Sequence, residues 1–205
     1  DKLAALNHDR YAHWSAKFDD ASGARASLLA FKGDVYLGLD AQTLSKRDFT
    51  WAQKRLRVLS GLYGLLRPLD RIHPYRLEMG TALRNTAGKD LYEFWGGKVT
   101  RALNEVLSGQ RSKVLINLAS NEYYKVVQAQ NIDGRIVTIN FKEWRRDAYR
   151  FVSFSAKKAR GLMARYMIDH RAERADDLKA FDVEGYAFNE ELSSRDEWIF
   201  TRHIA

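Results

Sequence analysis

Cysteine is absent from the 205-residue sequence, and proline occurs only twice. Without a thiol the chain can form no disulfide, no thiolate metal site and no iron–sulfur cluster, and it has no thiol that could react with peroxide. Both prolines, Pro68 and Pro74, lie in one stretch, residues 55–80. Because proline interrupts regular secondary structure, this stretch is where a turn that organises the fold is expected.

Long hydrophobic runs and familiar catalytic motifs are also missing. No apolar run approaches the roughly 18 residues that span a bilayer, and no basic, apolar leader opens the sequence, so we predict a cytoplasmic protein without a membrane partner. The five histidines are scattered, and HExxH, P-loop, GxGxxG and GxSxG motifs do not occur. We therefore expect no cofactor and no tight metal site, and we favour a non-enzymatic function.

The composition is that of a globular protein, because 45% of residues are apolar, 12% aromatic and 29% charged. The chain is long enough to bury its own core, and the absence of repeats and linker-like tracts predicts a single domain over residues 1–205. The formal net charge is +8. A surplus of this size favours polyanionic partners, with nucleic acid ahead of acidic membrane.

The proline-containing stretch reads RLRVLSGLYGLLRPLDRIHPYRLEMG. Apolar residues at helical spacing predict a helix that begins after the N-cap Ser45 and runs into the bend Gly61-Leu62-Tyr63-Gly64. The first proline suits the start of a second, short helix over residues 68–72, and the second proline ends it. Two helices joined by a glycine bend over about residues 46–73 form a hairpin whose free N–H groups can bind a DNA phosphate. The alternative is an ordinary turn that only packs two helices together.

Apolar patterning predicts the remaining elements. Helices are expected over residues 2–18, 91–107, 120–127 and 156–171, and the second of these has a weak point at Gly96-Gly97. Strands are expected over residues 27–31, 113–119, 135–141, 151–155 and 198–202, and a turn at 33–34 leads into a further segment over 35–38. The hydrophilic residues 142–150 form either a hairpin or a solvated excursion. Together these elements predict a mixed α/β (α+β) fold with a central mixed sheet flanked by helices.

Polar side chains follow the most apolar of the predicted strands. Asn117 lies at its end, and Ser120, Asn121, Glu122 and Lys125 come after it. Ligands of α/β proteins usually bind at the carboxyl ends of buried strands, so these residues are candidates for a binding site. The alternative is that they only cap a helix and complete hydrogen bonds at the end of the strand.

The helix predicted over residues 156–171 has two different sides. One side is apolar, and the other carries the cations Lys157, Lys158, Arg160, Arg165 and Arg171. Asp169 is the only acid at helical spacing from them, so the face is not internally paired and is suited to a polyanion. A lysine nucleophile with an acidic partner, Lys157 or Lys158 with Glu122, is the catalytic possibility that remains open.

Several motifs resemble one known family. They are LSGLYGLLRPLDRIHPYRLEMGT (59–81), LYEFWGGK (91–98), NLASNEYYK (117–125), SFSAKKARGLMARY (153–166), DLKAFDVEGYAF (177–188) and SSRDEWIFTR (193–202). In this order, and over essentially the whole chain, they are similar to the YaaA family of bacterial peroxide-stress proteins. Members of that family carry a further N-terminal portion with an ISPAK-like strand, so we expect residues ahead of Asp1.

The resemblance implies a DNA-binding protein that protects against hydrogen peroxide by limiting free iron, with a mixed α/β fold, a basic cleft and a helix-hairpin-helix. Carried onto this sequence, the hairpin is Gly61-Leu62-Tyr63-Gly64, followed by Arg67. The residues suited to lining the cleft are Lys157, Lys158, Arg160 and Arg165. We add further DNA-contact candidates, namely Arg76, Asn117, Asn121 and Lys125.

Three functions follow from these observations. We prefer a monomeric protein that binds duplex or branched DNA largely without sequence specificity. The first alternative is an enzyme that acts on nucleic acid or a small anionic substrate in the basic cleft. The second is an iron-handling protein, against which the absence of cysteine and of clustered histidines counts.

Overall fold

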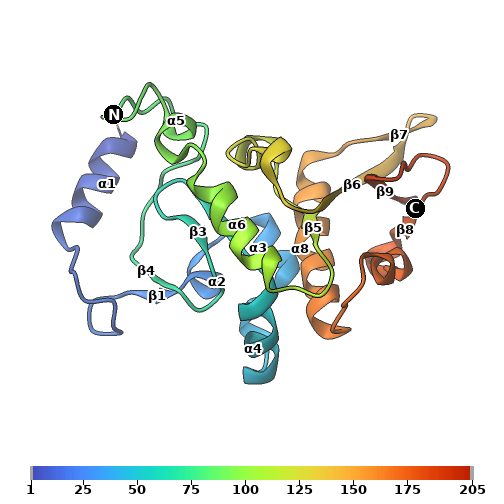
Figure 1. The fold of residues 1–205 in the computed structure, drawn as a ribbon, viewed down its shortest axis with the longest axis horizontal. Helices are drawn as coiled ribbons and strands as arrows, with labels where there is room; N and C mark the ends of the chain where they lie inside the picture. The colour runs from blue at the N-terminus through green and yellow to red at the C-terminus, as the bar shows by residue number, and fades with distance from the viewer. Residues whose placement is uncertain (1, 204–205) are drawn as a thin grey trace.

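The computed structural model describes the backbone of residues 2–203 and the side chains of residues 4–203. Figure 1 shows an elongated molecule with a sheet at one end and α1 at the other. The α-helices are α1 (Lys2–Ala12), α2 (Ser27–Ala30), α3 (Asp34–Leu39), α4 (Lys46–Arg55), α5 (Leu91–Trp95), α6 (Lys98–Ser108), α7 (Asn121–Tyr124) and α8 (Ser153–Asp169). The strands are β1 (Arg25–Ala26), β2 (Val58–Ser60), β3 (Gly64–Leu66), β4 (Arg71–Ile72), β5 (Val114–Asn117), β6 (Arg135–Arg145), β7 (Ala148–Arg150), β8 (Ala187–Phe188) and β9 (Glu197–Arg202). Short 3₁₀ helices are η1 (Ala41–Thr43), η2 (Ala129–Asn131), η3 (Ala175–Ala180) and η4 (Val183–Gly185).

The main sheet is mixed and is organised around β6. Its strands follow the order β5-β6-β9-β8, and β7 also pairs with β6. β5 and β9 run parallel to β6, whereas β7 and β8 pair antiparallel with β6 and β9. Helices flank this sheet in one mixed α/β domain, as predicted (Figure 1). Among the described residues, no helix combines the length and the apolar character that crossing a membrane requires.

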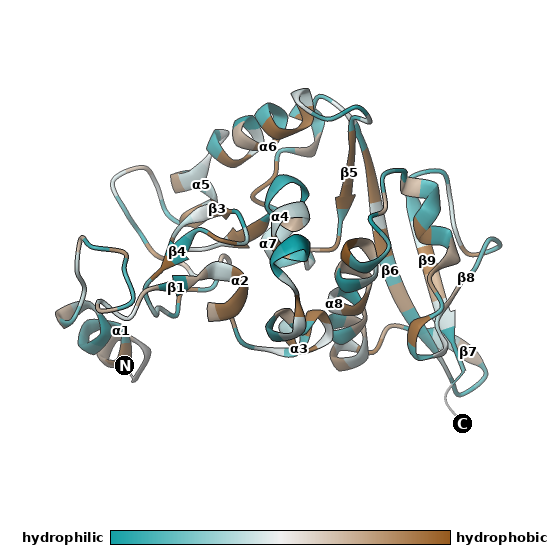
Figure 2. Ribbon diagram, turned by 90° about the horizontal axis from the view of Figure 1, so that it is seen from below, coloured by the Kyte–Doolittle hydropathy of each residue, from teal (hydrophilic) through white to brown (hydrophobic). Residues whose placement is uncertain are grey.

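One face of β6 is the centre of the first core cluster. Along the strand, burial alternates, and Val137, Ile139 and Phe141 are almost completely inaccessible to solvent. Trp198 and Phe200 of β9 lie beside them in register and point to the same face. α8 and the segment that contains η3 and η4 cover this face, and Figure 2 shows the hydrophobic residues gathered along the strands and α8.

α8 joins this cluster to a second one. Ala156, Ala159 and Met163 pack on the sheet, whereas Ala164 and Ile168 belong to a cluster built from α2, α3, α4 and the short strands β2, β3 and β4. α8 is therefore covered on two sides rather than one.

The second contact of α8, with α3, depends on two glycines. A Cβ on Gly38 would lie 2.1 Å from the carbonyl oxygen of Lys158, and a Cβ on Gly161 would lie 1.8 Å from that of Val35. Neither distance is possible for a real side chain, so each helix presents bare backbone to the other. This close approach fixes the distance between the sheet and the rest of the molecule.

A buried ionic network closes the carboxyl end of the sheet. Glu143 continues the inward series of β6 and is only 1% exposed, and Arg202 is its neighbour in register on β9. The Arg202 Nη2 donates to Glu143 Oε1 at 2.7 Å, and the Arg145 Nη2 donates to Glu143 Oε2 at 3.0 Å. Burial alone would raise the pKa of Glu143, but hydrogen bonds from Ser155, Arg202 and Arg145 outweigh it and hold that pKa below its usual value.

Several predicted elements are confirmed. The strands predicted over residues 113–119, 135–141 and 198–202 are β5, β6 and β9, and the hairpin across 142–150 joins β6 to β7. Ser45 caps α4 in a reciprocal capping box with Asp48. The weak point at Gly96-Gly97 separates two helices, α5 and α6, because Gly96 adopts a positive φ of 46°.

Other predictions are wrong. The strand predicted over residues 27–31 is helix α2, residues 35–38 lie in α3, and the strand predicted over 151–155 is replaced by the start of α8. These short apolar runs fit a buried helix as well as a strand, and the alternation rule cannot separate the two. The helix predicted over 2–18 ends at Ala12, and the helix predicted over 120–127 ends at Tyr124.

Gly161→Ala should separate α3 from α8. We expect it to lower the free energy of unfolding by about 3 kcal/mol, because the added methyl group collides with backbone rather than with a movable side chain. Urea denaturation followed by circular dichroism measures the change. Gly109→Ala is the matched control, since its Cβ would meet nothing closer than 3.7 Å, and equal stability of the two variants would contradict the close crossing.

Glu143→Gln should leave Arg202 and Arg145 without their counter-charge and lower the free energy of unfolding by about 3 kcal/mol near pH 7. Because the pKa of Glu143 is lower in the folded state, its ionised form stabilises the protein above the unfolded pKa, and this stabilisation disappears as the pH falls through the folded pKa. The difference between wild type and variant should therefore shrink below about pH 4.

Urea denaturation at several pH values measures the effect. Glu197→Gln is the control, because Glu197 is exposed and its Oε1 only accepts a hydrogen bond from the Asn140 Nδ2 at 2.9 Å. A Glu143→Gln variant as stable as this control would show that the buried network contributes nothing.

Candidate nucleic-acid interface

The predicted glycine bend is the turn of a β-hairpin. β2 pairs antiparallel with β3, with Ser60 opposite Gly64, so the bend joins two strands and not two helices. The short helix predicted over residues 68–72 is also wrong, because residues 71–72 form β4 and pair with β1. Tertiary contacts explain the difference: the carbonyl oxygen of Pro68 accepts a hydrogen bond from the Leu28 amide at 3.1 Å. A helix-hairpin-helix over residues 46–73 is therefore not what this segment forms.

Neighbouring residues also enclose the bend. The Trp95 indole donates to the carbonyl oxygen of Gly61 at 3.0 Å, and a Cβ on Gly64 would lie 2.6 Å from the Trp95 ring. A Cβ on Gly61 would lie 2.3 Å from the carbonyl oxygen of Leu77. Leu62 and Tyr63 are half-buried between the two glycines. The absence of side chains at Gly61 and Gly64 lets Leu77 and Trp95 pack against the bend, so the backbone of the bend is covered and cannot contact a phosphate.

The two arginines predicted from this segment have carboxylate partners. Arg67 forms an ion pair with Asp70 at 2.8 Å, and Arg76 forms one with Glu78 at 3.1 Å. Both arginines are exposed, so these pairs contribute little to stability, but they reduce the positive charge offered to a ligand.

The polar residues at the end of β5 and directly after it stabilise the end of the strand and the start of α7. Asn117 is buried, and its side chain accepts from the Ala119 amide at 3.0 Å and donates to Thr138 at 3.3 Å. Ser120 is the N-cap of α7. Asn121 is exposed at the first position of that helix, at the carboxyl end of the parallel strand β5.

Glu122 and Lys125 lie on the side of α7 that meets α5. Glu122 Oε1 accepts from the Gly80 amide at 2.9 Å, and the Lys125 ammonium lies 4.7 Å from the centre of the Tyr92 ring. Lys125 also lines a cavity of about 380 Å³ whose other lining residues are Lys89, Asp90, Tyr92, Glu93, Gly96, Val126 and Gln128.

No hydrogen bond or ion pair joins Glu122 to Lys157 or Lys158 among the described residues, so the candidate catalytic pair is not assembled.

The basic face predicted for α8 is divided. Lys158 forms an ion pair with Glu184, Arg165 pairs with Asp169 at 2.9 Å, and Arg171 pairs with Asp48. Arg165 also donates to Thr43 Oγ1 at 2.6 Å, which ties α8 to η1. The interpretation of this face as unpaired is wrong for these three cations. Arg165 pairs with Asp169, the one acid expected at helical spacing, whereas Glu184 and Asp48 come from other elements and could not be counted on one helix.

Two cations of α8 remain unpaired within the described part of the chain, Lys157 and Arg160. Lys157 is exposed, whereas Arg160 is only 7% exposed, and its Nε is completely buried without an acceptor. Burial lowers the pKa of Arg160, and no neighbouring charge compensates this effect. Arg160 is therefore a buried cation for which the described residues supply no anion.

Topology places these groups at one end of the sheet. β7 pairs with the last residues of β6, and α8 begins three residues after β7, so its first turns lie near the carboxyl ends of the parallel strands. In Figure 1 the start of α8 and the segment after β5 both lie in the upper half of the molecule. We call the exposed residues Asn121, Lys125 and Lys157 the carboxyl-end surface, and Arg160 lies buried beside it.

Sequence reasoning missed the ionic network that joins the buried Glu143 to Arg202 and to the exposed Glu184. Glu184 Oε2 accepts from Arg202 at 3.3 Å and links that network to Lys158. The sequence contained a signal for this network, because Glu143 occupies the next inward-facing position of β6 after Val137, Ile139 and Phe141. A carboxylate at that position requires cationic partners.

Within the described residues, no group of three or more histidine, aspartate or glutamate side chains is placed to hold a metal ion.

Comparison with known proteins gives a consistent result. The family described as "Peroxide stress protein YaaA" matches residues 1–192. The chain is 56% identical over 205 residues to the UPF0246 protein RSc2009 of Ralstonia nicotianae, covering 100% of this chain and 79% of that protein. It is 53% identical over 202 residues to a UPF0246 protein of Saccharophagus degradans, covering 98% and 78% of the two chains. The chain belongs to the YaaA family of peroxide stress proteins.

Proposed function

We propose that this chain binds DNA in the response to hydrogen peroxide, through phosphate contacts on the carboxyl-end surface. Membership of the peroxide-stress family supports the response. The ammonium groups of Lys125 and Lys157 are exposed and have no carboxylate partner among the described residues, and this observation supports the choice of surface. Contacts to phosphate do not distinguish bases, so binding is tolerant of sequence.

The position of this surface supports the proposal further. Lys125 follows β5 and Lys157 lies in the first turns of α8, so the two cations come from different elements at the same end of the sheet. Ligands of α/β folds commonly bind at this end. Asn121 adds an exposed amide that can donate to a phosphate oxygen.

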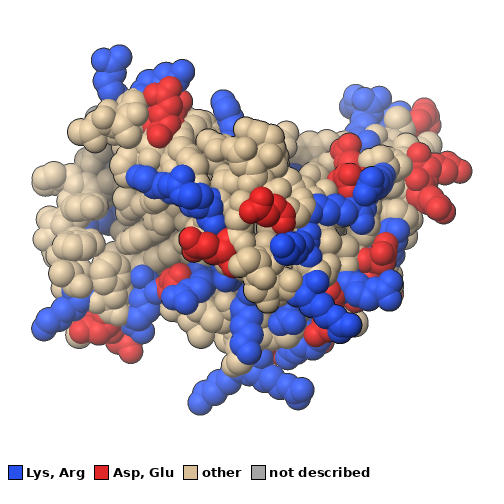
Figure 3. Space-filling view, in the orientation of Figure 1, with Lys and Arg blue, Asp and Glu red and all other residues tan. Residues whose placement is uncertain are grey.

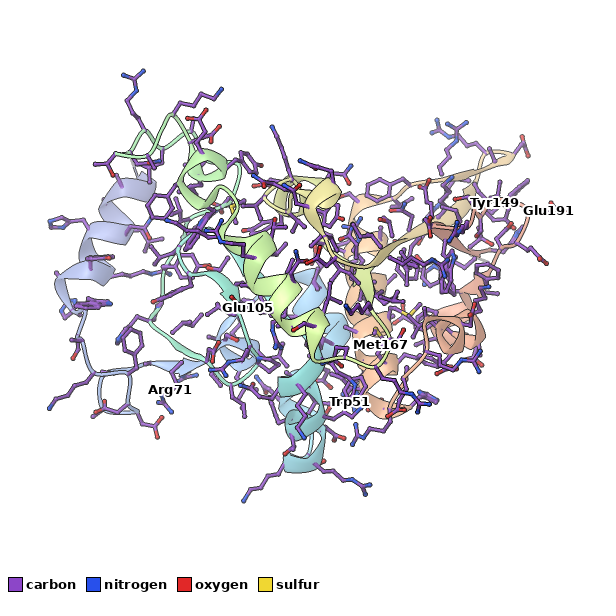
Figure 4. All side chains as sticks on the ribbon, in the orientation of Figure 1. Trp51, Arg71, Glu105, Tyr149, Met167 and Glu191 are labelled. Atoms are coloured by element: carbon purple, nitrogen blue, oxygen red, sulfur yellow. The ribbon has the colours of Figure 1, made fainter. Side chains whose placement is uncertain are left out.

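Two other basic regions are less suitable. The β6–β7 hairpin carries Arg146 and Arg150, but Figure 3 shows acidic side chains interspersed with cations at that end of the molecule. The cations on α4 extend from the lower edge of the molecule, and Figure 4 labels Trp51 on this helix, far below the start of α8. The α4 cations provide a control surface.

The double variant Lys125→Ala/Lys157→Ala should bind DNA about tenfold more weakly at physiological salt. Each lost phosphate contact removes a counterion-release step, so the slope of log affinity against log salt concentration should become shallower by about two. Fluorescence anisotropy with a labelled duplex at several salt concentrations measures both quantities.

Lys46→Ala/Lys54→Ala on α4 is the matched control, because it removes the same charge from exposed helical positions. Affinity close to that of wild type is expected for this control. Equal weakening by both double variants would show that net charge, and not the carboxyl-end surface, drives binding. A wild-type affinity for DNA that does not change with salt concentration would contradict binding through phosphate contacts and overturn the proposal.

A further inference from the structure

Arg160 differs from Glu143, which is also charged and buried. Glu143 is 1% exposed and is matched by two guanidinium groups. Arg160 is 7% exposed, and its guanidinium makes no hydrogen bond or ion pair with any described residue. A guanidinium cannot lose its proton at physiological pH, so it remains charged in this position.

A buried, unpaired cation is strongly unfavourable, because the protein interior does not replace the hydration that the charge has lost. A buried polar group without a partner in a native protein requires an explanation, and a bound ion is one of the recognised explanations. For a guanidinium that ion must be an anion. A planar anion or phosphate fits best, because the guanidinium offers parallel N–H donors.

The exposure of individual atoms gives the direction of approach. The Arg160 Nε is inaccessible to solvent, but Nη1 and Nη2 are not among the inaccessible atoms. The two terminal nitrogens of the guanidinium therefore keep some contact with solvent, whereas Nε does not. A ligand can contact Arg160 only at these terminal nitrogens.

Helix geometry gives the location. At 100° per residue, Arg160 lies between the side of α8 that packs on the sheet through Ala156 and Met163 and the side that packs on α3 and α4 through Ala164. Leu118, directly after β5, packs against both of these clusters. Arg160 thus lies where α8 meets the carboxyl end of β5, and Lys157 is one turn before it on the same side.

We propose that Arg160 is the floor of a binding site for a terminal phosphate group, with Lys157 at the rim. A terminal phosphate has three free oxygens and can insert end-on, whereas a phosphodiester is flanked by a sugar on each side and cannot reach a guanidinium this deeply buried. The site therefore takes a phosphate monoester or free phosphate. This inference goes beyond sequence-tolerant DNA binding and does not depend on it.

Thermal unfolding in inorganic phosphate tests the site, with sodium chloride of equal ionic strength as the reference. Phosphate at about ten times its Kd should raise the Tm of wild type by about 4 °C. Arg160→Met should abolish this rise and should have a Tm about 3 °C above wild type without phosphate, because an unpaired buried charge has been removed. Arg47→Met, which replaces an exposed arginine on α4, should keep the full rise.

Isothermal titration of wild type with inorganic phosphate gives a second readout that does not depend on a variant folding. Arg160→Lys, which keeps the charge but loses the fork, should bind at least tenfold more weakly. A rise in Tm that persists in Arg160→Met, or titration that detects no phosphate binding to wild type, would overturn the proposal.

Two oligonucleotides of the same sequence distinguish the sources of phosphate. An oligonucleotide with a 5′-phosphate should compete with inorganic phosphate for wild type at least tenfold more strongly than the same oligonucleotide with a 5′-hydroxyl, whose phosphodiesters reach only Lys157 at the rim. Equal competition by both would overturn the restriction to terminal phosphate. DNA binding that fails while phosphate binding persists would contradict the proposed function and leave this site intact.

Discussion

The close crossing of α3 and α8 is the constraint on which the rest of the structure depends. α8 supplies residues to the core cluster of the sheet and to the cluster built around α2, α3 and α4. Gly38 and Gly161 let the two helices meet backbone to backbone, so the sheet and the other half of the molecule have a fixed separation. The positions of Lys157 and Arg160 at the end of β5 follow from that separation. The α3–α8 glycines are thus a structural requirement of any site on the carboxyl-end surface.

Glu143 and Arg160 are both charged and both buried, but their surroundings are opposite. Glu143 is surrounded by cations from β6 and β9, and burial raises the pKa of the adjacent Tyr186 to about 12, so that side chain remains neutral beside them. The Arg202 guanidinium also lies 4.4 Å from the centre of the Tyr186 ring. Arg160 has no such surroundings among the described residues. The first arrangement stabilises the sheet internally, whereas the second is complete only with an external anion.

Elements that depend on local sequence were predictable. The strand over residues 135–141 and the N-cap at Ser45 depend on neighbours within a few residues, and both predictions are confirmed. The glycine bend and its proline were misassigned because Trp95, Leu77 and Leu28 decide their conformation from distant positions. The helical wheel grouped Arg160 with exposed cations because it assumes one buried side, and α8 has two. Gly161 in the middle of that helix was the available signal for the second contact.

The pairing of β9 with β6 has a consequence for how the protein reaches this structure. Arg202 and Glu143 are 59 residues apart along the chain, and the strands that carry them are parallel. Contacts of such long range form slowly, because the intervening chain must lose much of its freedom before any pairing is gained. Until β9 arrives, the inward face of β6 and one of its hydrogen-bonding edges stay open to other chains. Newly made copies are therefore most prone to aggregate through this strand while the sheet is incomplete.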